Sequence, residues 1–322
     1  MKVVNKYPLV SIISVNFNQS AVTLEMLESL RSISYPSIEI IIVDNGSPSD
    51  TPEIIKEKYP EVNLIISKKN LGFAGGNNLG VKESKGKYIL FLNNDTELEP
   101  GFLEPLVDVL EEKDEVAMAS PKLMFYFSEG KKLVQYAGAK AINPYTGRGY
   151  NIGYKQIDKG QFAKSRETDL GHGAALLVRM DTMLEYGLMP DIFFLYYEEH
   201  DWCAMLRQKG LKVWYVAEST VYHKESISIG KNSPLKAYHM ARNRVMYLRR
   251  RTNWPTFIVC MIYFFIVATP KIVLTYLLKR EFALFSAFNK GILWNFTHFK
   301  GVHKNPRIIK KGDTFELSNT YH

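Results

Sequence analysis

The 322-residue chain is 46% hydrophobic and 23% charged, a composition that excludes an intrinsically disordered or fibrous protein. Its formal charge of +8 is uneven, because residues 224–322 hold 17 basic and 4 acidic side chains, whereas residues 1–223 hold 24 and 29. Two cysteines, Cys203 and Cys260, are too few for a disulfide framework. Residues 1–8 lack the apolar core and cleavage site of a signal peptide, so the sequence predicts a cytoplasmic protein.

Strand-length apolar runs alternate with helix-like stretches through the first 120 residues. Strands are expected at 9–15, 38–43, 63–67, 88–92 and 116–120, and helices at 21–31, 52–59 and 102–112, with a glycine-rich loop to Gly76 and a short helix after it. This order predicts an α/β fold with a buried, mostly parallel sheet. Ligands of such sheets bind beyond the carboxyl ends of the strands, where Asp44, the loop after Ser67 and Asn93–Asp95 should meet.

The second half is less regular. Between residues 121 and 169 the periodicity fades, and loops or a hairpin are expected there. Regular apolar patterns return at 174–178 and 193–197, and a helix from about Asp201 to Gly210 and a strand at 212–216 follow. A strand-like run at 219–222 ends at His223.

Two polar segments and a glycine-rich segment follow predicted strands. Asp95 offers a hard oxygen ligand for Mg²⁺ or Mn²⁺, and the alternative is an ordinary turn residue. Asp44 can accept a hydrogen bond from a base or ribose, or cap the next helix. Residues 70–80 can bring backbone N–H groups close to a phosphate, or simply reverse the chain. They match neither the phosphate-loop nor the dinucleotide pattern, which disfavours an NTPase or a dehydrogenase.

Three carboxylates stand at the start of the helix expected near residue 200. Glu199 shares a helix face with Trp202 and other apolar residues, which favours a cleft, although acidic residues in a first turn also complement the helix dipole. His223 is open to three interpretations, a metal ligand, a core residue or a surface residue. His172 lies in a glycine-flanked turn that either lines an acceptor site or has no role.

Taken in order, these segments resemble glycosyltransferase family 2, and within it the rhamnosyltransferases of polysaccharide assembly. The resemblance covers roughly residues 10–248 and is carried by the segments 10–18, 43–47, 70–80, 91–96, 173–179 and 193–207. It implies a GT-A fold in residues 1–223, with a nucleotide-sugar half over about 1–120 and an acceptor half over 121–223. Residues 224–322 then form a basic, apolar tail.

The resemblance also assigns roles to individual residues. Nucleotide-sugar contacts are expected from Asn16, Asn18, Asp44, Gly72, Phe73, Gly75, Asn77, Asn93 and Asn94. Glu199 is expected to be the general base, and Asp201 to orient the acceptor or substitute as base. His172 and Trp202 are expected to contact the acceptor, and Asp95 and His223 to bind Mg²⁺ or Mn²⁺.

The chain departs from the family pattern in two places. Asn93 stands where the metal motif usually has a first carboxylate, and Glu198-Glu199 replaces the common Glu-Asp pair. The resemblance still implies inverting transfer from a dTDP- or UDP-sugar, with dTDP-rhamnose foremost, to a polyprenyl-linked glycan. Metal-assisted departure of the diphosphate and a carboxylate base are the chemistry that such a reaction needs.

The tail carries an apolar run at 256–269, which Pro270-Lys271 interrupts before a second run at 272–278. We expect two membrane-embedded or interfacial helices rather than one span. Arg249–Arg251 and Lys279-Arg280 flank the runs and suit an anionic lipid surface rather than nucleic acid, which places the protein on the cytoplasmic face of a bacterial membrane. The alternatives are a buried hairpin or the interface of a homodimer.

Three other functions share some of these features. A sugar nucleotidyltransferase also has an α/β nucleotide fold and a metal, but its glycine-rich, arginine-containing N-terminal signature is missing. A processive polysaccharide synthase should show several spans and a Gln-x-x-Arg-Trp motif, which are absent from the sequence. The non-enzymatic alternative is a membrane scaffold with a degenerate nucleotide fold, which sugar transfer dependent on Mn²⁺ and Asp95 would exclude.

Overall fold

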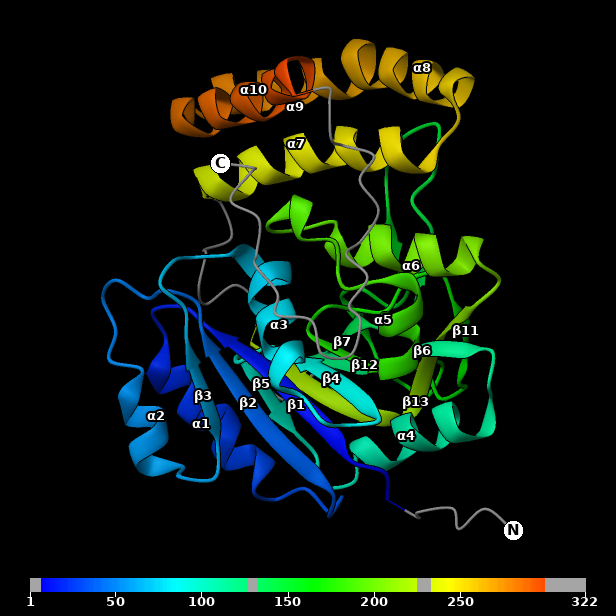
Figure 1. Cartoon of the computed structure of the whole chain (residues 1–322). Coiled ribbons are helices and arrows are strands. Elements are labelled where there is room, and N and C mark those ends of the chain that lie inside the picture. Colours follow the sequence, from blue (N-terminus) through cyan, green and yellow to red (C-terminus); the bar gives the residue numbers. More distant parts are fainter. Residues whose placement is uncertain (1–6, 127–131, 225–232, 299–322) are drawn as a thin grey trace.

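The computed structural model describes residues 7–126, 132–224 and 233–298. Most of the segment that was searched for a signal peptide, and residues 299–322 of the predicted tail, lie outside the described residues. Figure 1 shows a twisted central sheet with helices packed around it and the C-terminal helices stacked above it. The fold is mixed α/β, as the order of elements predicts.

Four parallel strands form the N-terminal half of the sheet in the order β3-β2-β1-β4. They are β1 (Val10–Asn16), β2 (Ile38–Asp44), β3 (Asn63–Ile66) and β4 (Tyr88–Leu92), connected by the helices α1 (Ser20–Leu30), α2 (Glu53–Lys58) and α3 (Gly72–Glu83). The central strands are covered on both faces, which is why they are continuous apolar runs. All four strand predictions for this half are confirmed.

Helix α3 begins at Gly72, inside the stretch that was expected to be a loop up to Gly76. That expectation is wrong because the glycines serve close packing between the helix and the sheet. A methyl group on Gly80 would lie 2.5 Å from Cγ2 of Ile13, and one on Gly76 would lie 3.1 Å from Val15. The small residues therefore let α3 lie directly on β1.

The C-terminal half of the sheet is mixed. Strand β12 (Ala175–Arg179) lies antiparallel between β4 and β6 (Val116–Phe125), and β13 (Lys212–His223) runs parallel to β6. Strand β13 joins the two runs expected at 212–216 and 219–222, and its end pairs with β5 (Thr96–Leu98). The helices of this half are α4 (Leu103–Glu112), α5 (Met180–Tyr186) and α6 (Glu198–Gln208).

The stretch between residues 121 and 169 holds more regular structure than expected. It contains β7 (Leu133–Tyr136), β8 (Ala139–Lys140), β9 (Tyr150–Asn151), β10 (Gln156–Ile157) and β11 (Arg166–Thr168). Strands β7 and β10 extend the sheet beyond β6, and β11 pairs with β13. All five strands have two to four residues, too few for a clear alternation of apolar and polar positions.

The apolar run at 193–197 is not a regular element. A short 3₁₀ helix, η1 (Asp191–Phe193), is followed by positive φ angles at Phe194, Tyr196 and Tyr197, of 64°, 67° and 76°. Each such conformation costs a bulky residue about 1 to 2 kcal/mol. Helix α6 begins directly afterwards, three residues before the expected start at Asp201. We call residues 193–197 the strained loop.

Within residues 233–298, four α-helices follow β13, and the first of them, α7 (Pro234–Arg251), holds the strained loop. Nδ2 of Asn243 donates to the carbonyl oxygens of Phe193, Leu195 and Tyr196 at 2.9, 2.7 and 2.8 Å. These buried hydrogen bonds offset the unfavourable backbone conformation. Helix α7, in the segment predicted to be a separate tail, is therefore part of the structure of residues 193–197.

The remaining helices are α8 (Trp254–Tyr263), a π-helical turn η2 (Phe264–Ala268), α9 (Thr269–Leu278) and α10 (Phe282–Thr297). The expected break at Pro270 is wrong, because α8, η2 and α9 form one continuous helix of 25 residues. Pro270 lies in the first turn of α9, directly after the π-helical turn that accommodates its missing N–H group. By length and composition this is the one described helix that could cross a membrane.

Helix α7 lies between α6 and the layer of α8 to α10 (Figure 1). Arg249 to Arg251 at its end were expected to face anionic lipid, and the structure corrects this. Arg249 is buried and donates to the carbonyl oxygen of Asn295, while Arg250 and Arg251 bind Asp201. These cations join α7 to α10 and α6.

Candidate active site

A cavity of about 500 Å³ opens where the carboxyl ends of β1, β2 and β4 meet, at the edge predicted for ligand binding. Eight of the predicted residues line it, namely Gly72, Phe73, Asn93, Asn94, Asp95, His172, Glu199 and His223. Seven others lie near it without lining it, namely Asn16, Asn18, Asp44, Gly75, Asn77, Asp201 and Trp202.

Asp95 and His223 form a close pair at the base of this cavity. Oδ1 of Asp95 lies 3.0 Å from Nε2 of His223, and both side chains are less than one-tenth exposed. Strand β13 delivers His223 to this position because its last residue pairs with Thr96, directly after Asp95. Two residues that are 128 positions apart in the sequence are therefore held together by backbone hydrogen bonds.

Gln135 fixes the tautomer of His223. Its Oε1 lies 2.9 Å from Nδ1, and an amide oxygen can only accept a hydrogen bond, so Nδ1 carries the proton. Nε2 faces Oδ1 of Asp95 and the Asn93 amide, which is 3.3 Å away, and in this tautomer it can offer its lone pair to a cation there. An imidazole whose other nitrogen is hydrogen-bonded in this way is the usual form of a metal-binding histidine.

The pair fits a divalent cation. Oδ1 of Asp95 is buried without a hydrogen-bond partner, and a carboxylate oxygen with an imidazole nitrogen is a donor set that Mn²⁺ or Mg²⁺ accepts. No group of three or more histidine, cysteine or acidic side chains with this geometry occurs within the described part of the chain. A cation held here would keep several coordination positions for oxygen atoms of a diphosphate and for water.

Glu198 and Glu199 line the cavity at the start of α6, directly after the strained loop. Burial, together with the charge of Glu199, raises the pKa of Glu198 well above its ordinary value. Burial would also raise the pKa of Glu199, but the neighbouring His200 imidazole outweighs it and holds that pKa below the ordinary value. These opposite shifts favour Glu199 as the ionised carboxylate that a general base must be, and Glu198 as the one that holds its proton more readily.

His172 lines the cavity close to His223 and Glu199 as a neutral imidazole. Burial, followed by the charge of nearby His223, lowers its pKa to about 4. Nδ1 accepts a hydrogen bond of 3.1 Å from the Ala174 N–H, so Nε2 carries the proton and can donate. The neighbouring Gly173 is close to the base, because a methyl group there would lie 3.9 Å from Cδ of Glu199.

The predicted nucleotide contacts at the ends of β1 and β2 bind one another. Oδ1 of Asp44 accepts hydrogen bonds from Nδ2 of Asn16 at 2.9 Å and from the Ser47 hydroxyl at 2.6 Å. Oδ1 of Asn18 accepts from the Ser49 N–H, at 3.0 Å. These bonds shape the turn after β2. They do not cap the next helix, the alternative weighed for Asp44, because α2 begins only at Glu53 and has no side-chain cap hydrogen bond. Asn45, directly after Asp44, lines the cavity.

The glycine-rich segment contributes through its first two residues. Gly72 has a φ of +73°, and a methyl group there would overlap the carbonyl oxygen of Phe194, so the position requires glycine. Phe73 lines the cavity beside it. Gly75 and Asn77 are buried within α3, where Nδ2 of Asn77 donates to the carbonyl oxygen of Phe73.

Asp201 and Trp202 are directed into the protein core and not into the cavity. Asp201 is fully buried, and its carboxylate accepts two hydrogen bonds of 3.0 Å from Arg250 and two of 2.6 Å from Arg251. Trp202 is equally buried and donates from Nε1 to the carbonyl oxygen of Gly187. Neither residue can contact an acceptor in this arrangement, which corrects the roles expected for both.

Several lining residues were missed in the sequence. Gln135 lies on β7, in the stretch without clear periodicity, and Ser233 and Lys236 lie at the start of α7. Gln19 lines the opposite wall, before α1. No local motif singles out these residues, because their positions depend on contacts between distant segments, such as Gln135 with His223 and Lys236 with Tyr196.

Comparison with known proteins decides the family. A sequence model described as Glycosyl transferase family 2 matches residues 11–180, slightly more than half of the chain. The chain belongs to glycosyl transferase family 2. This family membership agrees with the order of motifs that first pointed to it.

Similar proteins cover much of the chain at low identity. The low-salt glycan biosynthesis hexosyltransferase Agl10 of Haloferax volcanii is 23% identical over 244 residues, 73% of this chain and 74% of the relative. The N-acetylglucosaminyl-diphospho-decaprenol L-rhamnosyltransferase of Mycobacterium tuberculosis is 22% identical over 266 residues, 76% and 85% of the two chains. The uncharacterized protein y4gI of Sinorhizobium fredii is 28% identical over 77% of this chain, which spans only 28% of the length of y4gI.

Solved structures of glycosyltransferases share the fold. The mannosyltransferase PcManGT from Pyrobaculum calidifontis, in complex with GDP-Man and Mn²⁺, aligns over 91% of this chain and 88% of its own, with a TM-score of 0.57 and 14% identity. GalNAc-T7 with UDP, GalNAc and Mn²⁺ aligns over 78% and 50%, with a TM-score of 0.59 and 15% identity. The GT-A fold expected from the family 2 motifs is confirmed.

Proposed function

We propose that this family 2 member is an inverting glycosyltransferase that moves a sugar from a nucleoside diphosphate sugar to a lipid-linked glycan. The observation that carries the proposal is the presence, in one cavity of about 500 Å³, of the Asp95–His223 pair and an ionised Glu199. The nucleotide sugar and Mn²⁺ bound to PcManGT support a donor and a cation of the same kinds here.

The reaction is a single displacement. An acceptor hydroxyl attacks the anomeric carbon while the bond from that carbon to the phosphate oxygen breaks, and the nucleoside diphosphate leaves with the electron pair. Glu199 takes the proton of the hydroxyl. Such a base contributes about 10²- to 10⁴-fold to the rate, and one attack from the face opposite the leaving group inverts the anomeric centre.

Asp95 and His223 would hold Mg²⁺ or Mn²⁺ beside the diphosphate. A bound cation supplies Lewis-acid stabilisation of the negative charge that builds on the leaving group. Gln135 keeps His223 in the tautomer that can bind it, and Asn93 faces the same nitrogen without adding a second carboxylate. The neutral Nε2–H of His172 is placed to donate to an oxygen atom of either substrate.

The substrates are proposed from the family. dTDP-rhamnose is the first candidate donor, with UDP-hexoses and UDP-galactofuranose as alternatives. The name of the mycobacterial relative, which acts on a diphospho-decaprenol acceptor, supports a polyprenyl-linked glycan. A place on the cytoplasmic face of a bacterial membrane would give access to it, and the exposed Ile258, Ile262 and Ile266 on the 25-residue helix support attachment to lipid.

A donor panel with Mn²⁺ and a lipid-linked acceptor extract tests the proposal. The matched variants are Glu199→Gln and Glu198→Gln, since the two carboxylates are adjacent and only Glu199 is proposed as the base. Glu199→Gln should lower kcat at least 100-fold with saturating substrates, and Glu198→Gln much less, because the raised pKa of Glu198 favours its neutral form. Near-wild-type turnover in Glu199→Gln would show that the base is another group.

Asp95→Asn separates the enzyme from its alternatives. We expect transfer and donor hydrolysis to depend on Mn²⁺ in the wild type and to be lost in this variant. A scaffold would hydrolyse no nucleotide sugar under any metal condition. A sugar nucleotidyltransferase would instead release inorganic diphosphate when it joins a sugar phosphate to a nucleotide, or consume it in the reverse reaction. Phosphorus NMR distinguishes both reactions from the release of a nucleoside diphosphate.

A further inference from the structure

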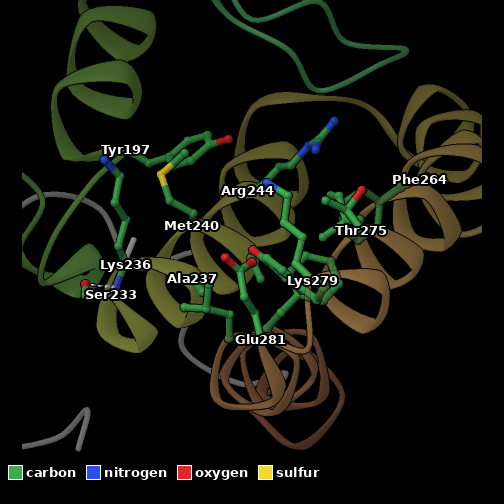
Figure 2. Close-up of a pocket in the computed structure, with 15 residues that line it drawn as sticks. Tyr197, Ser233, Lys236, Ala237, Met240, Arg244, Phe264, Thr275, Lys279 and Glu281 are labelled. Atoms are coloured by element: carbon green, nitrogen blue, oxygen red, sulfur yellow. Dashed lines mark hydrogen bonds between the residues drawn. The ribbon is translucent and has the colours of Figure 1, made fainter. Parts of the chain in front are cut away.

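A second cavity, of about 370 Å³, lies among α7, α9 and α10 (Figure 2). We call it the α7–α9 cavity. Ser233 and Lys236 stand at one end of it, beside Tyr197, and Phe264 and Thr275 stand at the other. None of the motifs in the sequence points to it, because its walls come from helices that follow the family 2 match.

The lining of the α7–α9 cavity is amphiphilic. Its apolar side chains are Met240, Phe264, Ile272, Leu284 and Phe288. Its charged side chains are Lys236, Arg244, Lys279 and Glu281, so the cations outnumber the carboxylates by three to one. Charged side chains beside apolar ones suit a ligand that has both an anionic and an apolar part.

The cations are available to an anion. Among the described residues, neither Lys236 nor Lys279 lies within 4.0 Å of a carboxylate. Arg244 donates from Nη2 to the carbonyl oxygen of Thr146 and lies over the Phe264 ring, but its buried Nε has no partner among these residues. That Nε lies beside Gly147, outside the lining, so Lys236 and Lys279 are the two cations left to interact with an anion in the cavity.

The α7–α9 cavity adjoins both the active site and the exposed apolar surface. Ser233 and Lys236 line the α7–α9 cavity and the catalytic cavity alike. On its other side, α9 carries the exposed Leu274 and Leu278, and α10 begins at the exposed Phe282. A molecule bound here therefore has one end near Glu198 and Glu199 and the other near apolar surface.

We propose that the α7–α9 cavity binds the diphosphate and the first isoprene units of the lipid-linked acceptor. Lys236 and Lys279 bind the diphosphate, and the apolar side chains contact the prenyl chain where it leaves toward the exposed face of α9. The sugar then extends past Ser233 to Glu199. The orientation of the acceptor, with its sugar toward Glu199, rests on the proposed function, but binding to the α7–α9 cavity can be measured without any turnover.

Titration calorimetry on the full chain in mild detergent tests this with four probes. Farnesyl diphosphate should bind at least tenfold more tightly than farnesol, inorganic pyrophosphate or phosphatidylglycerol. Lys279→Gln removes a cation and Met240→Trp fills the cavity, and each should weaken the binding of farnesyl diphosphate at least tenfold. Lys290→Gln, an exposed lysine on α10 outside the lining, is the matched control and should change the affinity less than twofold.

Urea unfolding of each variant shows that it is folded before binding is compared. If the wild type bound pyrophosphate or farnesol as tightly as farnesyl diphosphate, the proposal would be overturned. If it bound phosphatidylglycerol as tightly as farnesyl diphosphate, the site would be assigned to a membrane headgroup instead. Unchanged binding in both Lys279→Gln and Met240→Trp would overturn the location. Absence of Mn²⁺-dependent donor hydrolysis in the wild type would instead count against the proposed function alone.

Discussion

Substitution of Asp201 tests whether this residue has a catalytic or a structural role. Its fully buried carboxylate accepts four hydrogen bonds from Arg250 and Arg251, whose side chains are 5% and 11% exposed. Asp201→Asn keeps the shape but leaves two buried guanidinium groups without a counter-charge. Breaking a buried ion pair from one side costs about 3 to 5 kcal/mol, which corresponds to a fall in Tm of roughly 6 to 20 °C.

The assay is urea unfolding in mild detergent, combined with donor hydrolysis measured well below the unfolding transition. Asp169→Asn is the control, because its ion pair with Arg207 is about one-quarter to one-third exposed and should contribute at most about 1 kcal/mol. We expect Asp201→Asn to lose stability and to keep hydrolysis within about threefold per folded molecule. A loss of 100-fold in kcat with an unchanged unfolding curve would refute the structural role.

The surroundings of the site give three more tests. Gln135→Leu removes the acceptor that keeps the proton on Nδ1 of His223, so Mn²⁺ affinity by calorimetry should fall about 10- to 100-fold, and equal affinity would count against that role. Gly72→Ala would overlap the Phe194 carbonyl at a positive φ and should lower the free energy of unfolding in urea by more than about 2 kcal/mol; an unchanged midpoint would contradict this packing. Burial lowers the pKa of His239 to about 3, from 6.5 when exposed, so the neutral ring stabilises the fold fully above pH 6.5 and this stability is lost as the pH falls toward 3. The loss should reach about 3 kcal/mol at pH 4.5, and His239→Phe should lose correspondingly less than the wild type in acid unfolding; parallel curves would contradict it.

The parallel half of the sheet could be predicted because each of its strands is an uninterrupted apolar run. The placement of Asp95 after β4 followed from the rule that ligands meet at the carboxyl ends of such strands. His223 lies 3.0 Å from Asp95 because β13 pairs with β5 directly after Asp95. The resemblance implied that these two residues act together, but no local pattern in the sequence showed it. The order of motifs therefore carried more information than any one of them.

Other features depend on contacts that a local pattern does not contain. The glycines of α3 were expected to form a loop, because a local sequence pattern does not show that they pack against Ile13 of the sheet. The strained loop has an apolar composition, but its positive φ angles depend on Asn243, about 50 residues later. Asp201 was placed in the site by its position in a motif, whereas its partners on α7 determine what it contacts.

The hydrogen bonds of Asn243 bear on how this protein can be produced for study. An apolar C-terminal segment is often removed to obtain soluble material, and a fragment that ends at His223 would be an obvious choice. That fragment would lack the side chain that satisfies three carbonyl groups directly before Glu198 and Glu199. It would also lack the arginines that neutralise Asp201. Shortened versions should therefore retain α7 if they are to keep the base in place.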